Sequence, residues 1–155
     1  MISESEVIGM ADTGIDIREM GEEDVEGILS IERDVKGNNR AVTYAPVPDS
    51  CVGGEIGSSV VAEENGRIVG FVLGRVVSSP LELGDIAWIE LIGIHPEYQS
   101  KGIGKRMVEA WKDRCRAKGI RKVHIMVNWR DWWMQSFFES LGFCRGDLVD
   151  FQAEL

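Results

Sequence analysis

Apolar and polar residues recur along this chain with two different periods, which together predict a mixed α/β fold. Short apolar or alternating runs predict strands over residues 15–18, 58–63, 67–77, 85–94, 121–127 and 149–153. Apolar positions three and four residues apart predict helices that begin at residue 22 and that span about 103–117 and 131–140. We therefore expect one α/β domain over residues 15–155, preceded by a flexible N-terminal tail over residues 1–14.

Turn-forming residues separate these predicted elements. Glu64-Asn65-Gly66 joins two alternating runs and predicts a β-hairpin. Gly119 follows a helical pattern and is expected as the glycine that ends that helix. Residues 36–57 have no period and contain several Gly and Pro residues, so we expect a loop there with at most one short helix.

Length and composition limit the class of protein. A chain of 155 residues is long enough for one domain with a buried core. No apolar run approaches the roughly 20 residues that span a bilayer, and the acidic first residues lack the pattern of a signal peptide. Cys51, Cys115 and Cys144 have no metal-ligand spacing. We expect a cytoplasmic protein with reduced thiols, without a metal and without membrane contact.

The turn over residues 99–104 carries the most specific chemical signal. It follows an apolar strand and opens a helix, and glycine there lets backbone N–H groups approach an anion. A P-loop requires Ser or Thr where Arg106 stands, and a dinucleotide fingerprint requires Gly where Met107 stands. The pattern therefore predicts a different pyrophosphate-binding turn, with a plain strand-to-helix turn as the structural alternative.

Three blocks resemble the GNAT N-acetyltransferase superfamily. Gln-x-x-Gly-x-Gly over residues 99–104 is similar to its acyl-CoA pyrophosphate loop. Leu-Ile-Gly-Ile-His-Pro-Glu-Tyr-Gln over residues 91–99 resembles its fourth strand, and Phe-Phe-Glu-Ser-Leu-Gly-Phe over 137–143 resembles a helix end of that family. The blocks cover residues 85–145 in the family's order. The resemblance implies a single GNAT-like domain, with a twisted mixed sheet of six to seven strands flanked by about four helices.

The resemblance also assigns cofactor-binding residues. The pyrophosphate of acetyl-CoA would bind the backbone of the turn and its nearby cations. The pantetheine arm would bind the main chain of the fourth strand, where that strand carries a bulge and separates from the fifth, and one N–H there would stabilise the oxyanion. Gly93 suits such a bulge or a close backbone approach. The residues in question are Ile92, Gly93, Ile94, Gln99, Ser100, Lys101, Gly102, Ile103, Gly104 and Lys105.

Two further residues are candidates on the acyl-transfer side. Asn128 would bond the amide groups of the cofactor, or else serve as a helix cap or turn residue. Glu90 is the candidate general base, because an ammonium group must lose a proton before it can attack. A solvated glutamate is the alternative for Glu90, and Asp85 and Glu55 are weaker substitutes.

Charge is unevenly distributed along the chain, whose net charge is −9. Residues 101–130 carry 10 basic and 2 acidic side chains, whereas residues 1–100 carry 6 basic and 19 acidic ones. The basic block begins at the predicted turn and suits an anionic cofactor, and the acidic part suits a cationic amine or is simply solvated surface. Nucleic-acid binding is not expected, because the protein is acidic and lacks an RNA-binding motif.

The resemblance implies an enzyme that moves an acetyl group from acetyl-CoA to a primary amine by direct attack in a ternary complex. A protein N-terminus, a lysine and a small amine all stay open as acceptors, and a homodimer is compatible with the sequence. Residues 30–57 and 78–84 are expected to select the acceptor. The alternative is a catalytically weak acyl-CoA-binding sensor or interaction module, which Phe138 favours because the family has a tyrosine acid at that position.

Overall fold

The computed structural model describes residues 14–36, 59–79, 84–147 and 149–155, and it divides into two compact units. The first unit runs to Ile125 and the second covers Met126–Leu155. The predicted tail, except Gly14, and most of the predicted loop over residues 36–57 lie outside the described residues. The prediction of one domain over residues 15–155 stays a prediction.

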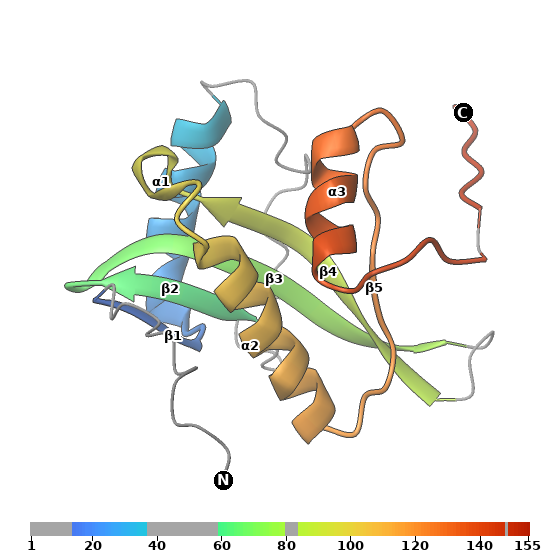
Figure 1. Ribbon diagram of the computed structural model, residues 1–155, viewed down its shortest axis with the longest axis horizontal. Helices are drawn as coiled ribbons and strands as arrows, with labels where there is room; N and C mark the ends of the chain where they lie inside the picture. Colours follow the sequence, from blue (N-terminus) through green and yellow to red (C-terminus); the bar gives the residue numbers. More distant parts are fainter. Residues whose placement is uncertain (1–13, 37–58, 80–83, 148) are drawn as a thin grey trace, which may run out of the picture. The chain divides into compact units, whose positions relative to one another are not determined.

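The first unit is built on a five-stranded sheet in the order β1-β2-β3-β4-β5 (Figure 1). Neighbouring strands are antiparallel except β4 and β5, which are parallel. All five strands fall on runs predicted from the sequence, which confirms the mixed α/β class with a slightly lower strand count than expected. The strands are β1 Ile15–Glu19, β2 Val60–Glu64, β3 Arg67–Ser79, β4 Gly84–Ile94 and β5 Val123–Ile125.

The strand predicted over residues 149–153 was wrong. This segment has no regular structure, and Val149 and Phe151 are exposed. A strand needs a neighbour to satisfy its backbone hydrogen bonds, and the described residues of the second unit contain no strand for this segment to pair with. Alternation of apolar and polar residues alone did not create one.

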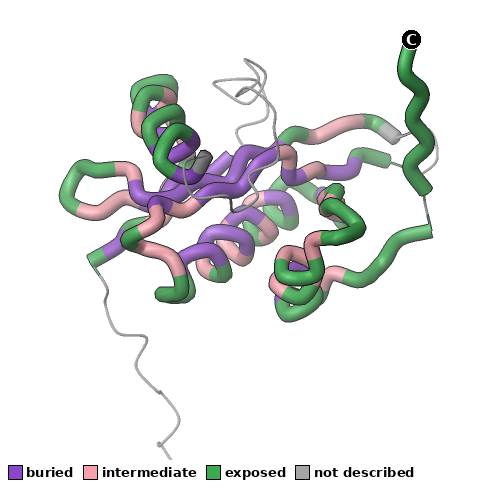
Figure 2. The backbone as a smooth tube through the Cα atoms, turned by 90° about the horizontal axis from the view of Figure 1, so that it is seen from above, coloured by how far each residue is buried: buried purple, intermediate pink, exposed green. Residues whose placement is uncertain are grey.

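Two helices cover opposite faces of the sheet in the first unit (Figure 2). Helix α1, Val25–Lys36, follows the short 3₁₀ helix η1, Glu22–Asp24, and buries Ile28 and Ile31 against Phe71 and Leu91. Helix α2, Ile103–Ala117, packs on the other face. The described part of the second unit contains α3, Trp132–Ser140. Apolar stripes at helical spacing thus predicted these helices correctly.

Backbone turns explain two of the predicted boundaries. Asn65 and Gly66 both have positive φ, 50° and 81°, which is the requirement of a two-residue type I′ hairpin between β2 and β3. Gly119 has φ of 79° directly after α2, so it is the predicted helix-ending glycine.

An ion-pair cluster fixes β1 to the start of α1. The guanidinium of Arg18 donates two hydrogen bonds of 2.8 Å to Asp24 and two, of 2.6 and 2.9 Å, to Glu63 on β2. Burial acts to raise the pKa of Asp24, but the hydrogen bonds from Arg18 and from the N–H of Gly21 outweigh it and lower the pKa. Because these hydrogen bonds lower its pKa, Asp24 is ionised in the folded protein at neutral pH although its side chain is buried.

The Asp24→Asn variant should be less stable than the parent at pH 7 by about 2 kcal/mol, the typical worth of hydrogen bonds to a charged group. Because the folded-state pKa is lowered, the contribution of Asp24 is complete above its unfolded pKa of about 3.9 and disappears as pH falls through the folded value. Urea unfolding at pH 7, 4 and 3 should therefore show a stability difference that shrinks below pH 4. A constant difference would contradict this role.

Candidate active site

Strand β4 has different partners along its length. It pairs with β3 from end to end, but it pairs with β5 only where Ala87, Trp88 and Ile89 face Val123–Ile125. Over residues 91–94 no described strand of the first unit pairs with the other edge of β4. An edge without a neighbouring strand can bind an extended chain of another molecule through its backbone groups.

A β-bulge lies where the pairing with β5 ends. Leu91 faces Leu73 and Ile89 faces Gly74, so Glu90 is the extra residue on β4. The sequence analysis offered Gly93 for a bulge or a close approach, and the bulge at Gly93 was wrong. A Cβ at position 93 would lie 2.6 Å from the ring of Phe71, so glycine is needed there for that ring to pack.

The bulge places Glu90 beside a cation. The Glu90 side chain is 19% exposed, and its Oε1 lies 2.5 Å from Nε of Arg75 on β3. Side chains alternate along β3, so Arg75 projects from the same sheet face as Phe71 and Leu73, which pack against α1. Glu90 therefore presents a half-buried carboxylate on the α1 face, next to the unpaired edge of β4.

The two substitutes for Glu90 are less suitable or are not described. Asp85, at the start of β4, is exposed and accepts a hydrogen bond of 2.7 Å from the Ser78 hydroxyl. Glu55 lies outside the described residues. Among the candidate bases that the structure describes, Glu90 alone lies at the bulge.

The turn after β4 is held by its own residues. A 3₁₀ helix η3, Pro96–Tyr98, follows β4, and the Gln99 amide donates a hydrogen bond of 3.2 Å to the carbonyl of Ile94. Ser100 and Gly102 both have left-handed backbones, with φ of 62° and 77°. Lys101 lies above the Tyr98 ring, 4.9 Å from its centroid. These contacts fold the backbone sharply between β4 and α2.

The first turn of α2 has free N–H groups. Gly102 is the N-cap and supplies no side-chain hydrogen bond, and the first helical bond runs from the N–H of Arg106 to the carbonyl of Gly102. Ile103 and Gly104 are buried, whereas Lys105 is exposed. A helix start in this state offers backbone donors and a partial positive charge to an anion.

The side chains of the apolar residues in the predicted site pack into the protein interior. Ile92 and Gly93 are buried and Ile94 is half-buried, so only their main chain is available to a ligand. In the first unit, Glu90, the edge of β4 and the 99–105 turn follow one another along the chain.

Asn128 and Phe138 belong to the second unit. The Asn128 side chain accepts a hydrogen bond of 2.8 Å from the N–H of Arg130, which makes it a turn residue. Asp131, rather than Asn128, caps α3 by accepting from the N–H of Met134 at 3.0 Å. Phe138 is buried, with its ring 5.0 Å from Phe137 and 5.2 Å from Phe143. A cofactor contact of Asn128 stays a prediction.

The described residues contain neither a cluster of metal-binding side chains nor a membrane-spanning helix. No group of three or more His, Cys, Asp or Glu side chains converges there as a metal site. Within the same residues, no helix is long and apolar enough to cross a membrane. Burial raises the pKa of the Cys115 thiol to about 11, and Cys144 is exposed. A cytoplasmic location and a homodimer stay predictions.

Comparison with known proteins identifies the family. The sequence model described as the Acetyltransferase (GNAT) family matches residues 25–143. The chain belongs to the GNAT acetyltransferase family. The match includes α1 and the three segments that the sequence singled out, which are the bulged strand β4, the 99–105 turn and the helix end at Phe143.

Curated GNAT-related proteins match parts of the chain. It is 30% identical over 91 residues to the mycothiol acetyltransferase of Renibacterium salmoninarum, covering 59% of this chain and 27% of that protein. It is 32% identical over 68 residues to an acetyltransferase of Pectobacterium atrosepticum, covering 44% of each. The chain thus spans less than half the length of these curated relatives.

Solved GNAT structures share the fold. An aminoglycoside acetyltransferase from an uncultured soil metagenomic sample, in complex with sisomicin, has a TM-score of 0.72 at 20% identity, over 93% of this chain and 98% of that one. Aminoglycoside N-acetyltransferase AAC(6')-Iy in complex with CoA has a TM-score of 0.72 at 17% identity, over 90% and 94%. A ribosomal-protein-alanine N-acetyltransferase from Brucella melitensis has a TM-score of 0.71 at 14% identity, over 91% of this chain and 99% of that one.

The sequence analysis missed Arg75 as a site residue. Arg75 lies 15 positions before Glu90, and the two meet only because β3 and β4 pair in the register that the bulge creates. No local pattern signals such a contact. A cation on the neighbouring strand is visible in the sequence, but its position opposite Glu90 is not.

Proposed function

We propose that this chain is an acetyl-CoA-dependent N-acetyltransferase that transfers the acetyl group to a primary amine. The observation that carries the proposal is the edge of β4 over residues 91–94, which has no strand partner among the described strands of the first unit and is followed, after η3, by the start of α2 without a side-chain cap. An extended pantetheine arm suits the first feature and a diphosphate suits the second. Membership of the GNAT family and the CoA bound to AAC(6')-Iy support this interpretation.

The turn is proposed to bind the diphosphate through main-chain groups. N–H groups at the start of α2 point at an anion without competition from a capping side chain, and the left-handed Gly102 leaves space above them. The exposed cations Lys101 and Lys105 add attraction. Gln99 contributes indirectly, by tying the turn to the carbonyl of Ile94.

The edge of β4 is proposed to hold the thioester. Main-chain groups of Ile92, Gly93 and Ile94 would pair with the amides of the pantetheine arm as a neighbouring strand would. One N–H at this edge would donate to the carbonyl oxygen of the acetyl group and stabilise the negative charge of the tetrahedral intermediate.

Glu90 is proposed to accept the proton of the acceptor ammonium, directly or through a water. An alkylamine has a pKa of about 10.4, so most of it is protonated at pH 7 and carries no lone pair. After deprotonation the nitrogen attacks the thioester carbon, the new C–N bond forms, and the C–S bond breaks to release CoA thiolate. Arg75 would orient the Glu90 carboxylate through the contact that the structure shows.

Phe138 cannot protonate the leaving thiolate. The lack of an acidic hydroxyl at position 138 costs little free energy. Releasing a thiolate instead of a thiol of pKa about 8.5 at pH 7 costs about 2 kcal/mol. Water can supply the proton after departure. The alternative of a weakly catalytic acyl-CoA sensor rests on this residue alone.

Release of CoA thiol from acetyl-CoA, measured against a panel of acceptors, tests the proposal. The panel contains monoamines, polyamines, an aminoglycoside, a lysine peptide and a peptide with a free N-terminus, because the solved neighbours include aminoglycoside and ribosomal-protein-alanine acetyltransferases. Amine-dependent thiol release is expected with at least one acceptor. Thermal stabilisation by acetyl-CoA without thiol release for any acceptor would favour the sensor. If acetyl-CoA neither stabilises the protein nor releases thiol, both the transferase and the sensor are contradicted.

A further inference from the structure

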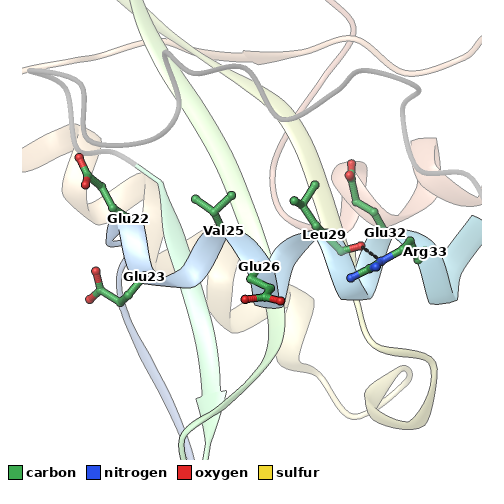
Figure 3. Close-up of a pocket in the computed structure, with 7 residues that line it drawn as sticks. All are labelled: Glu22, Glu23, Val25, Glu26, Leu29, Glu32 and Arg33. Atoms are coloured by element: carbon green, nitrogen blue, oxygen red, sulfur yellow. Dashed lines mark hydrogen bonds between the residues drawn. The ribbon is translucent and has the colours of Figure 1, made fainter.

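One flank of α1 borders a cavity of about 780 Å³ that the acetyl-transfer chemistry does not use. Four carboxylates line it, from Glu22, Glu23, Glu26 and Glu32, together with the apolar side chains of Val25 and Leu29. Figure 3 shows Glu22, Val25, Leu29 and Glu32 pointing to the same side of the helix. The cavity is open to solvent, because five of the seven lining residues are exposed, and its volume is in the range that accommodates small organic ligands.

Glu32 is the residue that indicates a ligand. It is only 5% exposed, and its Oε1 atom is buried without any hydrogen-bond donor. A buried carboxylate oxygen without a donor is costly, because desolvation is not compensated. A bound cation would supply the missing partner, and Glu32 points into the cavity where that cation would lie (Figure 3).

The other charges of this flank leave the negative potential uncompensated. Within the described part of the chain, Glu22, Glu23 and Glu26 make no ion pair or side-chain hydrogen bond. Arg33, the one cation among the lining residues described, donates to the carbonyl of Leu29 at 3.2 Å instead of binding a carboxylate. The cavity therefore attracts cations.

The spacing of the carboxylates favours an elongated organic cation over a metal ion. No three carboxylates of the described residues converge on one point. Glu22 and Glu32 are ten residues apart, which is about 15 Å along a helix, and Val25 and Leu29 lie between them. Ammonium groups separated by hydrocarbon segments match this order of charged and apolar side chains.

We propose that the α1 flank binds a linear polyamine, and that this polyamine is the class of acceptor. That the polyamine is the acetyl acceptor rests on the proposed function. Helix α1 packs on β3 and β4, and the contact with Arg75 places the Glu90 carboxylate on the face of the sheet that α1 covers. A polyamine on the α1 flank would therefore lie on the same side of the sheet as the proposed base.

Calorimetric titration with spermidine and with butylamine tests binding without any acetyl transfer. Spermidine should bind at least tenfold more tightly than butylamine at equal ionic strength, and Glu32→Gln should weaken spermidine binding at least tenfold. The Glu22→Gln/Glu26→Gln double variant, which changes two exposed residues, should also weaken spermidine binding. Glu139→Gln, which removes the same charge from an exposed position on α3, should change neither affinity.

Folding and catalysis are monitored separately. Glu32→Gln should melt at the same or a higher temperature than the parent, because it removes an unpartnered buried charge. In the thiol-release assay it should lower kcat/KM for spermidine at least tenfold relative to kcat/KM for butylamine. Tight spermidine binding without thiol release would leave the polyamine site standing and refute the transferase.

Three results would overturn the polyamine site. Equal affinity for spermidine and butylamine is the first, and Mg²⁺ replacing spermidine at equal concentration is the second. The third is a lysine-rich peptide that binds more tightly than spermidine through Glu32. Acetylation of butylamine as efficient as that of spermidine would refute the acceptor class while the transferase proposal survives.

Discussion

The Glu90→Gln variant is expected to lose turnover by a factor of about 10²–10⁴, the usual contribution of a positioned general base. Glutamine has nearly the same size as glutamate and can still bond Arg75, so the bulge and the sheet register should survive. Affinity for acetyl-CoA should be unchanged, because the cofactor is proposed to bind the main chain of β4 and the 99–105 turn. Steady-state thiol release and calorimetric titration of acetyl-CoA measure the two quantities.

Asp85→Asn is the matched control for this experiment. Asp85 lies on the same strand, loses the same charge and bonds only the exposed Ser78 hydroxyl among the contacts described. Its turnover should stay at the parent level. Unchanged turnover in Glu90→Gln would remove Glu90 from the mechanism, and loss in Asp85→Asn alone would transfer the role of base to Asp85.

The Gly102→Asp variant is expected to raise the Kd for acetyl-CoA by at least about 100-fold. A Cβ at position 102 meets no atom within 4 Å, so the new side chain fits, and Asp tolerates the left-handed backbone better than most residues. Its carboxylate would lie beside the N–H groups proposed for the diphosphate. Two unit charges 4 Å apart near a protein surface repel by about 4 kcal/mol, which is more than enough for this loss.

Gly102→Asn separates charge from backbone strain. Asparagine has the same shape as aspartate and accepts the same left-handed backbone, but it is neutral. Its affinity for acetyl-CoA should fall much less than that of Gly102→Asp, while both variants should unfold at similar temperatures. Equal losses in the two variants would mean that the backbone at Gly102, and not an anion site, controls binding.

Local signals in the sequence were sufficient for most of the fold. The hairpin at Asn65 and Gly66 follows from two residues that accept positive φ, and α2 follows from an apolar stripe between Gly102 and Gly119. The shape of the 99–104 turn, which we propose binds an anion, could be predicted for the same reason, because it depends on contiguous backbone. These features depend on short-range rules that one sequence reveals.

Features that depend on strand register could not be predicted in detail. Glycine at position 93 indicated a close approach, and only the packing of Phe71 shows why it is needed. The bulge at Glu90 and its contact with Arg75 result from how β3 and β4 align over their whole length. The alternating segment over residues 149–153 failed as a strand because alternation does not supply a pairing partner.

Titration of ¹⁵N-labelled protein with acetyl-CoA, followed by amide chemical shifts, tests the central claim most directly. The amides of Ile92–Ile94 and of residues 100–105 should show the largest shift changes, since they are proposed to bind the pantetheine arm and the diphosphate. Amides of the α1 flank should change little with acetyl-CoA alone. Binding that leaves the β4 edge and the turn unchanged, or no binding at all, would contradict the account.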